Sequence, residues 1–234
     1  MQNNSDRFLN VFNAIERHLQ LKYNNGAFAP FRSILKTAAA KDMIFRRYQE
    51  DLFVFGDLRN VLVHSDRFGG RTIAEPLDEI VEEIESIWHL IQNPDRVTIF
   101  EREIHYCYWE DKLEKALQLM KKYKILQVPV IENGLIKEVL TGNHIAFWLA
   151  GQDLVTISET KISQVLLQAE YRNNFTIIPR NLSVYEAAEI SKNSFKQEPK
   201  NRYYDALIIT KNGRAHEKMT GIIVMKDIAG YILD

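Results

Sequence analysis

The sequence predicts an α+β protein of two domains, an all-α helical bundle over residues 1–93 and an α/β part over residues 94–234. Three observations predict this division. Apolar residues recur with helical spacing through about residue 90, short β-rich runs alternate with helical ones beyond Asn93-Pro94-Asp95, and the second half repeats itself. A chain of 234 residues with 46% apolar and 26% charged residues can bury a core in each domain.

Composition excludes several classes of protein. Thirty basic against 31 acidic residues give a net charge of −1, so any nucleic-acid surface has to be local. One cysteine, Cys107, excludes an internal disulfide and fits a reducing compartment. No apolar run approaches the ~20 residues that span a bilayer, and the polar start lacks the pattern of a signal peptide. We therefore expect a cytoplasmic protein with no membrane partner.

The first domain reads as a bundle of four or five helices. Ser5 can cap a first helix, and Pro30 opens the next segment, where Phe31–Leu35 forms a short helix. Residues 36–64 then read as one long helix, or as two with a break near Gly56. A last amphipathic helix starts near Pro76. The stripe that the first helix buries is Phe8, Phe12, Ile15 and Leu19.

The second half contains two copies of one unit, each running strand, helix, strand, turn, strand, helix. Three pairs of segments correspond: 104–116 with 175–187, 128–134 with 206–213, and 139–145 with 222–228. Strands are expected at 104–108 and 175–179, and Asn-Gly turns reverse the chain within each hairpin. A unit of this length present twice predicts two similar α/β modules that pack on each other.

A signature precedes the last helix of each copy. It reads Gly221-Ile-Ile-Val224-Met-Lys-Asp227 in the second copy and Glu138-Val-Leu-Thr141-Gly-Asn-His144 in the first. Together with the Val128-Pro-Val130 strand and the hairpins, it resembles the Gly-apolar-x-Thr/Ser-x-x-Asp signature of a tandem CBS-domain pair. The first copy then covers about 95–152 and the second about 158–234. The second copy keeps the Asp, and the first copy keeps the Thr.

The CBS resemblance implies an adenine nucleotide (AMP, ADP or ATP) as a regulatory ligand in a cleft between the modules. By motif position, Asp227 is expected to hold the ribose diol, whose two hydroxyls a carboxylate can bind. Thr141 is expected to contact phosphate or ribose. His144 either removes diol recognition from the first site or turns that site toward phosphate. Thr160 and Val165 are expected near the base. The alternative is a pair that only packs and dimerises.

The helix of the first domain that ends near residue 64 carries Arg59-Asn60-Val-Leu-Val-His64. Asn60 and His64 are four residues apart and lie one above the other, with Arg59 beside them. This pattern, together with Phe12-Asn-Ala-Ile-Glu16 in the first helix, resembles the HEPN family of helical bundles. The resemblance implies a metal-independent endoribonuclease that works as a homodimer, with Arg59, Asn60 and His64 as catalytic residues. No His/Asp/Glu cluster suggests a metal site, and catalysis needs no cofactor.

The chemistry suits these residue types. A histidine can move the 2′-hydroxyl proton or supply one to the leaving oxygen, and a guanidinium can bind the phosphate as charge builds. The expected products carry 2′,3′-cyclic phosphate and 5′-hydroxyl ends. Arginines around the motif form a local basic surface for RNA: Arg46, Arg47, Arg67 and Arg71.

Three interpretations of the helical domain stay open. It is a ribonuclease regulated by the CBS pair, a non-catalytic dimerisation or docking element of a nucleotide sensor, or a toxin-type ribonuclease paired with an antitoxin. A lone histidine at a helix C-terminus can also have no role other than to stabilise the helix through its dipole. Arg59 and His64 point about 140° apart on a regular helix, so a partner chain is expected to complete an active site. A monomeric variant should then be inactive.

Overall fold

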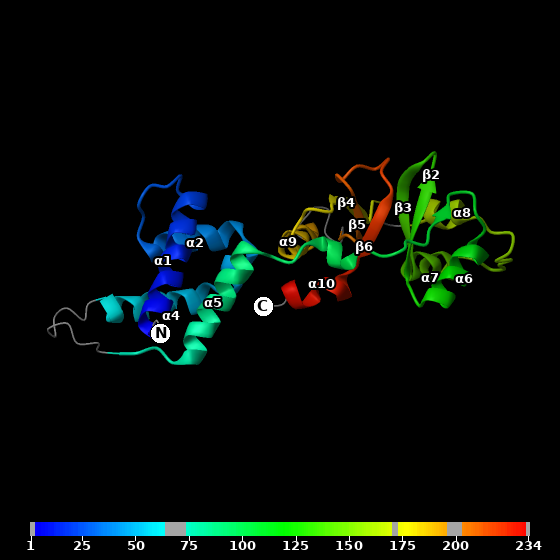
Figure 1. The fold of residues 1–234 in the computed structure, drawn as a ribbon. Helices are drawn as coiled ribbons and strands as arrows, with labels where there is room; N and C mark the ends of the chain where they lie inside the picture. The colour runs from blue at the N-terminus through cyan, green and yellow to red at the C-terminus, as the bar shows by residue number, and fades with distance from the viewer. Residues whose placement is uncertain (1–2, 64–73, 170–172, 196–202, 233–234) are drawn as a thin grey trace. The chain divides into compact units, whose positions relative to one another are not determined.

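The structure, a computed structural model, describes residues 3–63, 74–169, 173–195 and 203–232. The chain divides into two compact units, Met1–Asp95 and Arg96–Asp234 (Figure 1). We describe each unit by itself. Within the described residues, no helix combines the length and the apolar character needed to cross a bilayer.

The first unit is helical, as the sequence predicted. Its described elements are α1 (Asn4–Tyr23), α2 (Phe31–Lys41), α3 (Met43–Arg47), α4 (Gln49–Val63) and α5 (Asp78–Gln92). The predicted stripe of α1 is buried throughout, and α1 packs against α2, α4 and α5. Arg7 on α1 forms a two-bond ion pair with Glu85 on α5 at 2.9 and 3.2 Å. Helical periodicity therefore located the core of this unit correctly.

The predicted helix boundaries within residues 36–64 were wrong. The chain breaks at Asp42, which ends α2 and whose side chain then accepts the amide of Ile44 at 3.0 Å to start α3. A second break follows at Tyr48. Gly56 does not break a helix but lies within α4, where a Cβ would stand 3.1 Å from the ring of Phe31. The glycine serves close packing between α4 and α2.

The second unit holds two three-stranded sheets. The first module contains η2 (Val97–Phe100), β1 (Cys107–Tyr108), α6 (Leu113–Tyr123), β2 (Gln127–Glu132), β3 (Leu135–Thr141), α7 (Gly142–Ala150) and α8 (Ile162–Leu167). The second contains β4 (Phe175–Pro179), α9 (Val184–Ser194), β5 (Ala206–Thr210), β6 (Met219–Ile223) and α10 (Met225–Ile232). In each sheet the first strand is parallel to the second, which is antiparallel to the third.

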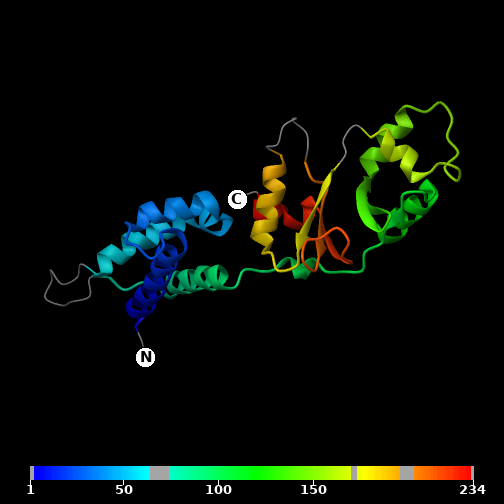
Figure 2. The same ribbon diagram turned by 90° about the horizontal axis from the view of Figure 1, so that it is seen from above.

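The two modules pack through their sheets. Helices α9 and α10 contact each other and lie on one side of the second sheet (Figure 2). The opposite side shares a core with the first module, because buried residues of β3 cluster with those of β5 and β6. This shared core contains Ile136, Val139, Ala206, Ile208, Ile222 and Val224. The predicted pairing of two similar units is therefore present within the second unit.

The expected strand at residues 104–108 is shorter than predicted, since β1 comprises only Cys107 and Tyr108. The residues ahead of it bind the second module instead. The amide of Arg102 donates to the carbonyl of Thr220 at 2.9 Å, and Glu101 forms a bridge with Gly221. We call residues 100–105 the leading segment. Its backbone pairs with β6, through the Glu101–Gly221 bridge and the hydrogen bond from Arg102 to Thr220, and the chain joins the first sheet only after it, at β1.

The approach of the leading segment to β6 requires glycine at position 221. A Cβ there would stand 2.8 Å from the carbonyl oxygen of Phe100 and 2.7 Å from Cδ1 of Ile209. We predict that Gly221→Ala lowers the free energy of unfolding by roughly 1–3 kcal/mol, because the crossing backbone has to shift. Urea denaturation of the full chain measures this change.

Gly230→Ala is the matched control, since an added Cβ at this position in α10 meets no atom of the described residues within 4 Å. This substitution should raise the free energy of unfolding by at most about 1 kcal/mol, because alanine is more favourable than glycine within a helix. Equal effects of the two substitutions would show that the backbone crossing at Gly221 is not a constraint.

Candidate functional site

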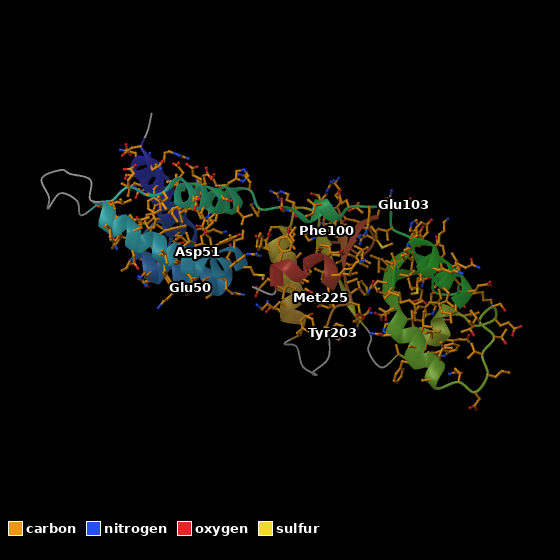
Figure 3. All side chains as sticks on the ribbon, turned by 90° about the horizontal axis from the view of Figure 1, so that it is seen from below. Glu50, Asp51, Phe100, Glu103, Tyr203 and Met225 are labelled. Carbon is orange, nitrogen blue, oxygen red and sulfur yellow. The ribbon has the colours of Figure 1, made fainter. Side chains whose placement is uncertain are left out.

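A cavity of about 640 Å³ lies between the two modules of the second unit. Its walls come from the leading segment, the end of α6 with the start of β2, the residues ahead of β5, and the turn from β6 into α10. Glu103, Tyr203 and Met225 mark three of these walls (Figure 3). A volume of this size is in the range that holds small molecules and nucleotides.

Aromatic side chains line the cavity in two stacked pairs. The ring of His105 lies 3.5 Å from that of Tyr123 with an 18° interplanar angle. Phe195 and Tyr203 stack at 5.6 Å and 16°. One pair belongs to the first module and the other to the second. Flat rings of this kind offer a planar base a stacking surface.

Three cationic side chains and two carboxylates line the same cavity. Arg102, Lys124 and Lys226 supply the positive charge, and Glu103 and Asp205 the negative. Burial raises the pKa of Asp205 above its ordinary value, although a hydrogen bond from Asn174 and the charge of His144 act in the opposite direction. The charge balance in the cavity therefore favours an anionic ligand.

Asp227 stands at the start of α10 next to this cavity wall, with its side chain 14% exposed. Its Oδ2 accepts the amide of Val224 at 2.9 Å, which is the second half of a capping box. The same oxygen lies 3.6 Å from Nη2 of Arg102, whose guanidinium also donates to the carbonyl of Ile222 at 2.7 Å. Asp227, the residue predicted to bind ribose, is thus already bound to the backbone at the start of α10 and lies next to Arg102.

The first copy of the signature is buried. Thr141 supplies the other half of a capping box, because its hydroxyl accepts the amide of His144 at 3.2 Å. Thr141 is 4% and His144 8% exposed. Val165 is fully buried in the core of the first module, and the hydroxyl of Thr160 donates to the carbonyl of Thr156. Among the predicted nucleotide contacts, Asp227 alone adjoins the cavity wall formed by residues 222–226.

A buried polar network occupies the place in the first copy that corresponds to Gly221. Glu138 stands at that position, is 6% exposed, and accepts the amides of Asn173 and Asn174 at 3.1 and 3.2 Å. The side chain of Asn174 bonds both the amide and the carbonyl of Val139, and also donates to Asp205 at 2.7 Å. The side chains of Glu138 and Asn174 therefore make here the contact that the backbone of the leading segment makes at Gly221.

A second cavity, of about 400 Å³, lies in the helical unit, and Arg59 and Asn60 line it. Nη1 of Arg59 donates to Oδ1 of Asn60 at 3.3 Å. Nε of Arg59 is buried and has no hydrogen-bond partner among the described residues. Glu16, from the first helix, lines the same cavity. The structure thus brings together two of the predicted catalytic residues.

The remaining predicted RNA contacts divide into two groups. Nε of Arg46 donates to the carbonyl of Ala39 at 2.9 Å, which satisfies the C-terminal end of α2, and Arg47 lies over the ring of Tyr48 at 5.8 Å. The predicted residues that lie outside the described part of the chain are His64, Arg67 and Arg71.

Sequence reasoning missed the leading segment and the residues ahead of β5. A signal was present for part of the site, because Lys226 lies inside the second signature, one residue before Asp227. Arg102 precedes the first repeated strand and His105 lies within its predicted range, so the repeat alone assigns both to the first module. The hydrogen bonds of Arg102 to Thr220 and Ile222 depend on a crossover between modules, which has no local pattern in the sequence.

A family model for the CBS domain matches residues 99–151, which spans the leading segment and the first module through α7. A comparison with curated proteins finds no match. The first α/β module is thus identified as a CBS domain by its sequence, as the resemblance predicted. The HEPN resemblance of the helical unit stays a prediction.

Solved structures with CBS domains are similar to this chain. A protein with CBS domains from Burkholderia ambifaria is 15% identical, with a TM-score of 0.44, and the match covers 59% of this chain and 93% of that one. A CBS-domain protein from Agrobacterium tumefaciens is 17% identical at 0.43, covering 58% and 97%. The CBS domain of a bacterial CNNM/CorC family Mg²⁺ transporter is 16% identical at 0.43, covering 76% and 96%.

Proposed function

We propose that the second unit has a regulatory role and binds one adenine nucleotide in the cavity between its two modules. The observation that carries this proposal is the cavity itself, whose walls combine stacked aromatic rings with three cations, Arg102 of the leading segment, Lys124 at the end of α6 and Lys226 at the start of α10. The aromatic rings can stack on a planar base, and the cations together with the N-terminus of α10 can bind phosphate. The CBS-domain match in the first module supports the same ligand class.

The proposal assigns Arg102 a change of partner on binding. In the free protein its guanidinium faces Asp227 and the carbonyl of Ile222. A phosphate is a stronger partner for a guanidinium than a distant carboxylate, so the nucleotide draws Arg102 away and leaves Asp227 to accept the ribose hydroxyls. A ligand that binds only one arrangement of Arg102 shifts the balance between the two arrangements.

We predict that AMP, ADP or ATP raises the melting temperature of the full chain by about 5–10 °C at a concentration of about 100 times Kd. Lys226→Gln should weaken binding about tenfold, since the variant loses a charge-assisted bond to phosphate. Thermal shift and titration measure both effects, with S-adenosylmethionine as a further adenosine ligand.

The matched control is Lys121→Gln, which removes an exposed lysine of α6 outside the cavity lining and should bind as the natural protein does. The proposal fails if no adenosine ligand stabilises the protein. It also fails if the two lysine variants bind equally well.

We further propose that the helical unit cleaves RNA without a metal, as a homodimer. The pairing of Arg59 with Asn60 at the wall of a cavity favours this second function, because a guanidinium held there can bind the phosphodiester. His64 moves the proton of the 2′-hydroxyl in this mechanism. Nucleotide binding in the second unit then sets the activity, since CBS pairs couple a ligand to an attached domain.

Mixed RNA incubated with the pure protein in EDTA should yield 2′,3′-cyclic phosphate and 5′-hydroxyl ends. We predict that Arg59→Ala lowers the rate at least 100-fold, because the transition state loses a charged donor, and that His64→Ala does the same. Arg17→Ala removes an exposed arginine of α1 and serves as control. Cleavage that survives in Arg59→Ala would come from a different site, and absence of cleavage with and without nucleotide leaves the unit as a docking element.

A further inference from the structure

The cavity beside Arg59 carries more chemistry than phosphate binding needs. Its lining combines aromatic rings, two carboxylates, an amide and two guanidinium groups from α1, α2, α4 and the loop between α1 and α2. Phosphate contacts use the guanidinium and amide groups only. The aromatic rings and the carboxylates can therefore bind a part of a ligand other than its phosphate.

Phe28 is the first of these groups. Its side chain lines the cavity and is 85% exposed, and its ring stacks on no described aromatic ring. The loop that carries it is held firmly, because the Gln20 side chain donates to the carbonyl of Ala29 at 2.7 Å and accepts its amide at 3.1 Å. Asn24 bonds the carbonyl of Ala27 at 2.9 Å. A loop with a fixed backbone thus presents an exposed apolar ring at the cavity, where a flat ligand can stack on it.

Glu16 is the second group. It lines the same cavity as Arg59, yet no described basic side chain forms an ion pair with it. The neighbouring carboxylate of Asp57 is instead engaged by Arg32 at 2.7 Å, and Arg32 also lies 4.9 Å from the ring centre of Phe53. Both oxygens of Glu16 therefore remain available to hydrogen-bond donors of a ligand.

We propose that this cavity is a base-binding subsite that selects guanine in single-stranded RNA, next to the phosphate held by Arg59. Guanine presents two adjacent donors, N1–H and N2–H, that match the two oxygens of one carboxylate. Adenine and cytosine place an acceptor beside their single exocyclic donor, and uracil flanks its one donor with acceptors. The ring of Phe28 stacks on the base. This inference rests on the proposed RNA cleavage for its biological role, but the subsite can be tested separately.

Fluorescein-labelled hexanucleotides of 2′-O-methyl RNA, uridine throughout except for one internal base, test the subsite. They lack the 2′-hydroxyl nucleophile, so binding to the full chain is measured without cleavage. The guanine oligonucleotide should bind about 10–100-fold more tightly than those with adenine, cytosine or uracil. Glu16→Gln should remove this preference, because the amide replaces one acceptor with a donor.

Glu83→Gln, an exposed carboxylate on α5 outside the cavity lining, is the matched control and should keep the preference. Phe28→Ala should weaken all four oligonucleotides alike, and its ring is exposed enough that folding does not depend on it. Fixed salt concentration is needed, since phosphate contacts vary with it.

The outcomes separate the two proposals. Guanine preference that depends on Glu16, with no cleavage of unmodified RNA, supports the subsite and overturns the ribonuclease. Three results would overturn the subsite. These are cleavage of RNA by a protein that does not prefer guanine, a guanine preference that persists in Glu16→Gln, and absence of binding to any of the oligonucleotides.

Discussion

Contact between the leading segment and β6 is the constraint on which the second unit depends. Because residue 221 has no side chain, the backbone at Phe100 and Glu101 lies directly against it, and Arg102 bonds Thr220. This crossing joins the start of the first module to the last strand of the second. It also brings Arg102 and His105 to the cavity that the α10 start lines from the other side. The proposed ligand site is therefore a product of the crossing.

The corresponding contact between the chain ahead of β4 and β3 of the first module is made by side chains. Glu138 replaces the glycine and holds the chain ahead of β4 through its carboxylate, with Asn174 bonding both modules. Backbone contact on one side and buried side chains on the other make the two modules similar in fold but different in how each contacts the other. Each copy also keeps one half of a capping box, Thr141 in the first and Asp227 in the second. The signature residues thus start helices, whatever else they bind.

Local patterns in the sequence predicted the elements well, and contacts between distant segments poorly. Apolar spacing located the core of α1, and the aligned repeat located the corresponding helices α6 and α9, whose first residues Leu113 and Val184 are both fully buried. The break at Asp42 was missed because a side-chain cap interrupted an otherwise continuous helical pattern. The cavity residues of the leading segment were missed because a crossover between modules leaves no periodic signal. Arg59 and Asn60 are consecutive residues of one helix, so their proximity follows from the chain, and their catalytic role stays a prediction.

The decisive measurement for the proposed ligand site is the number of adenine nucleotides that bind to each chain. We expect one, because the leading segment and α10 line a cavity with cations and aromatic rings, whereas in the first copy Glu138 and Asn174 are engaged with neighbouring backbone and His144 stands in place of the ribose-binding Asp. Titration calorimetry of the full chain with AMP and with ATP gives this number. A stoichiometry of one nucleotide per chain agrees with the account. Two nucleotides per chain, or no binding of either ligand, contradicts it.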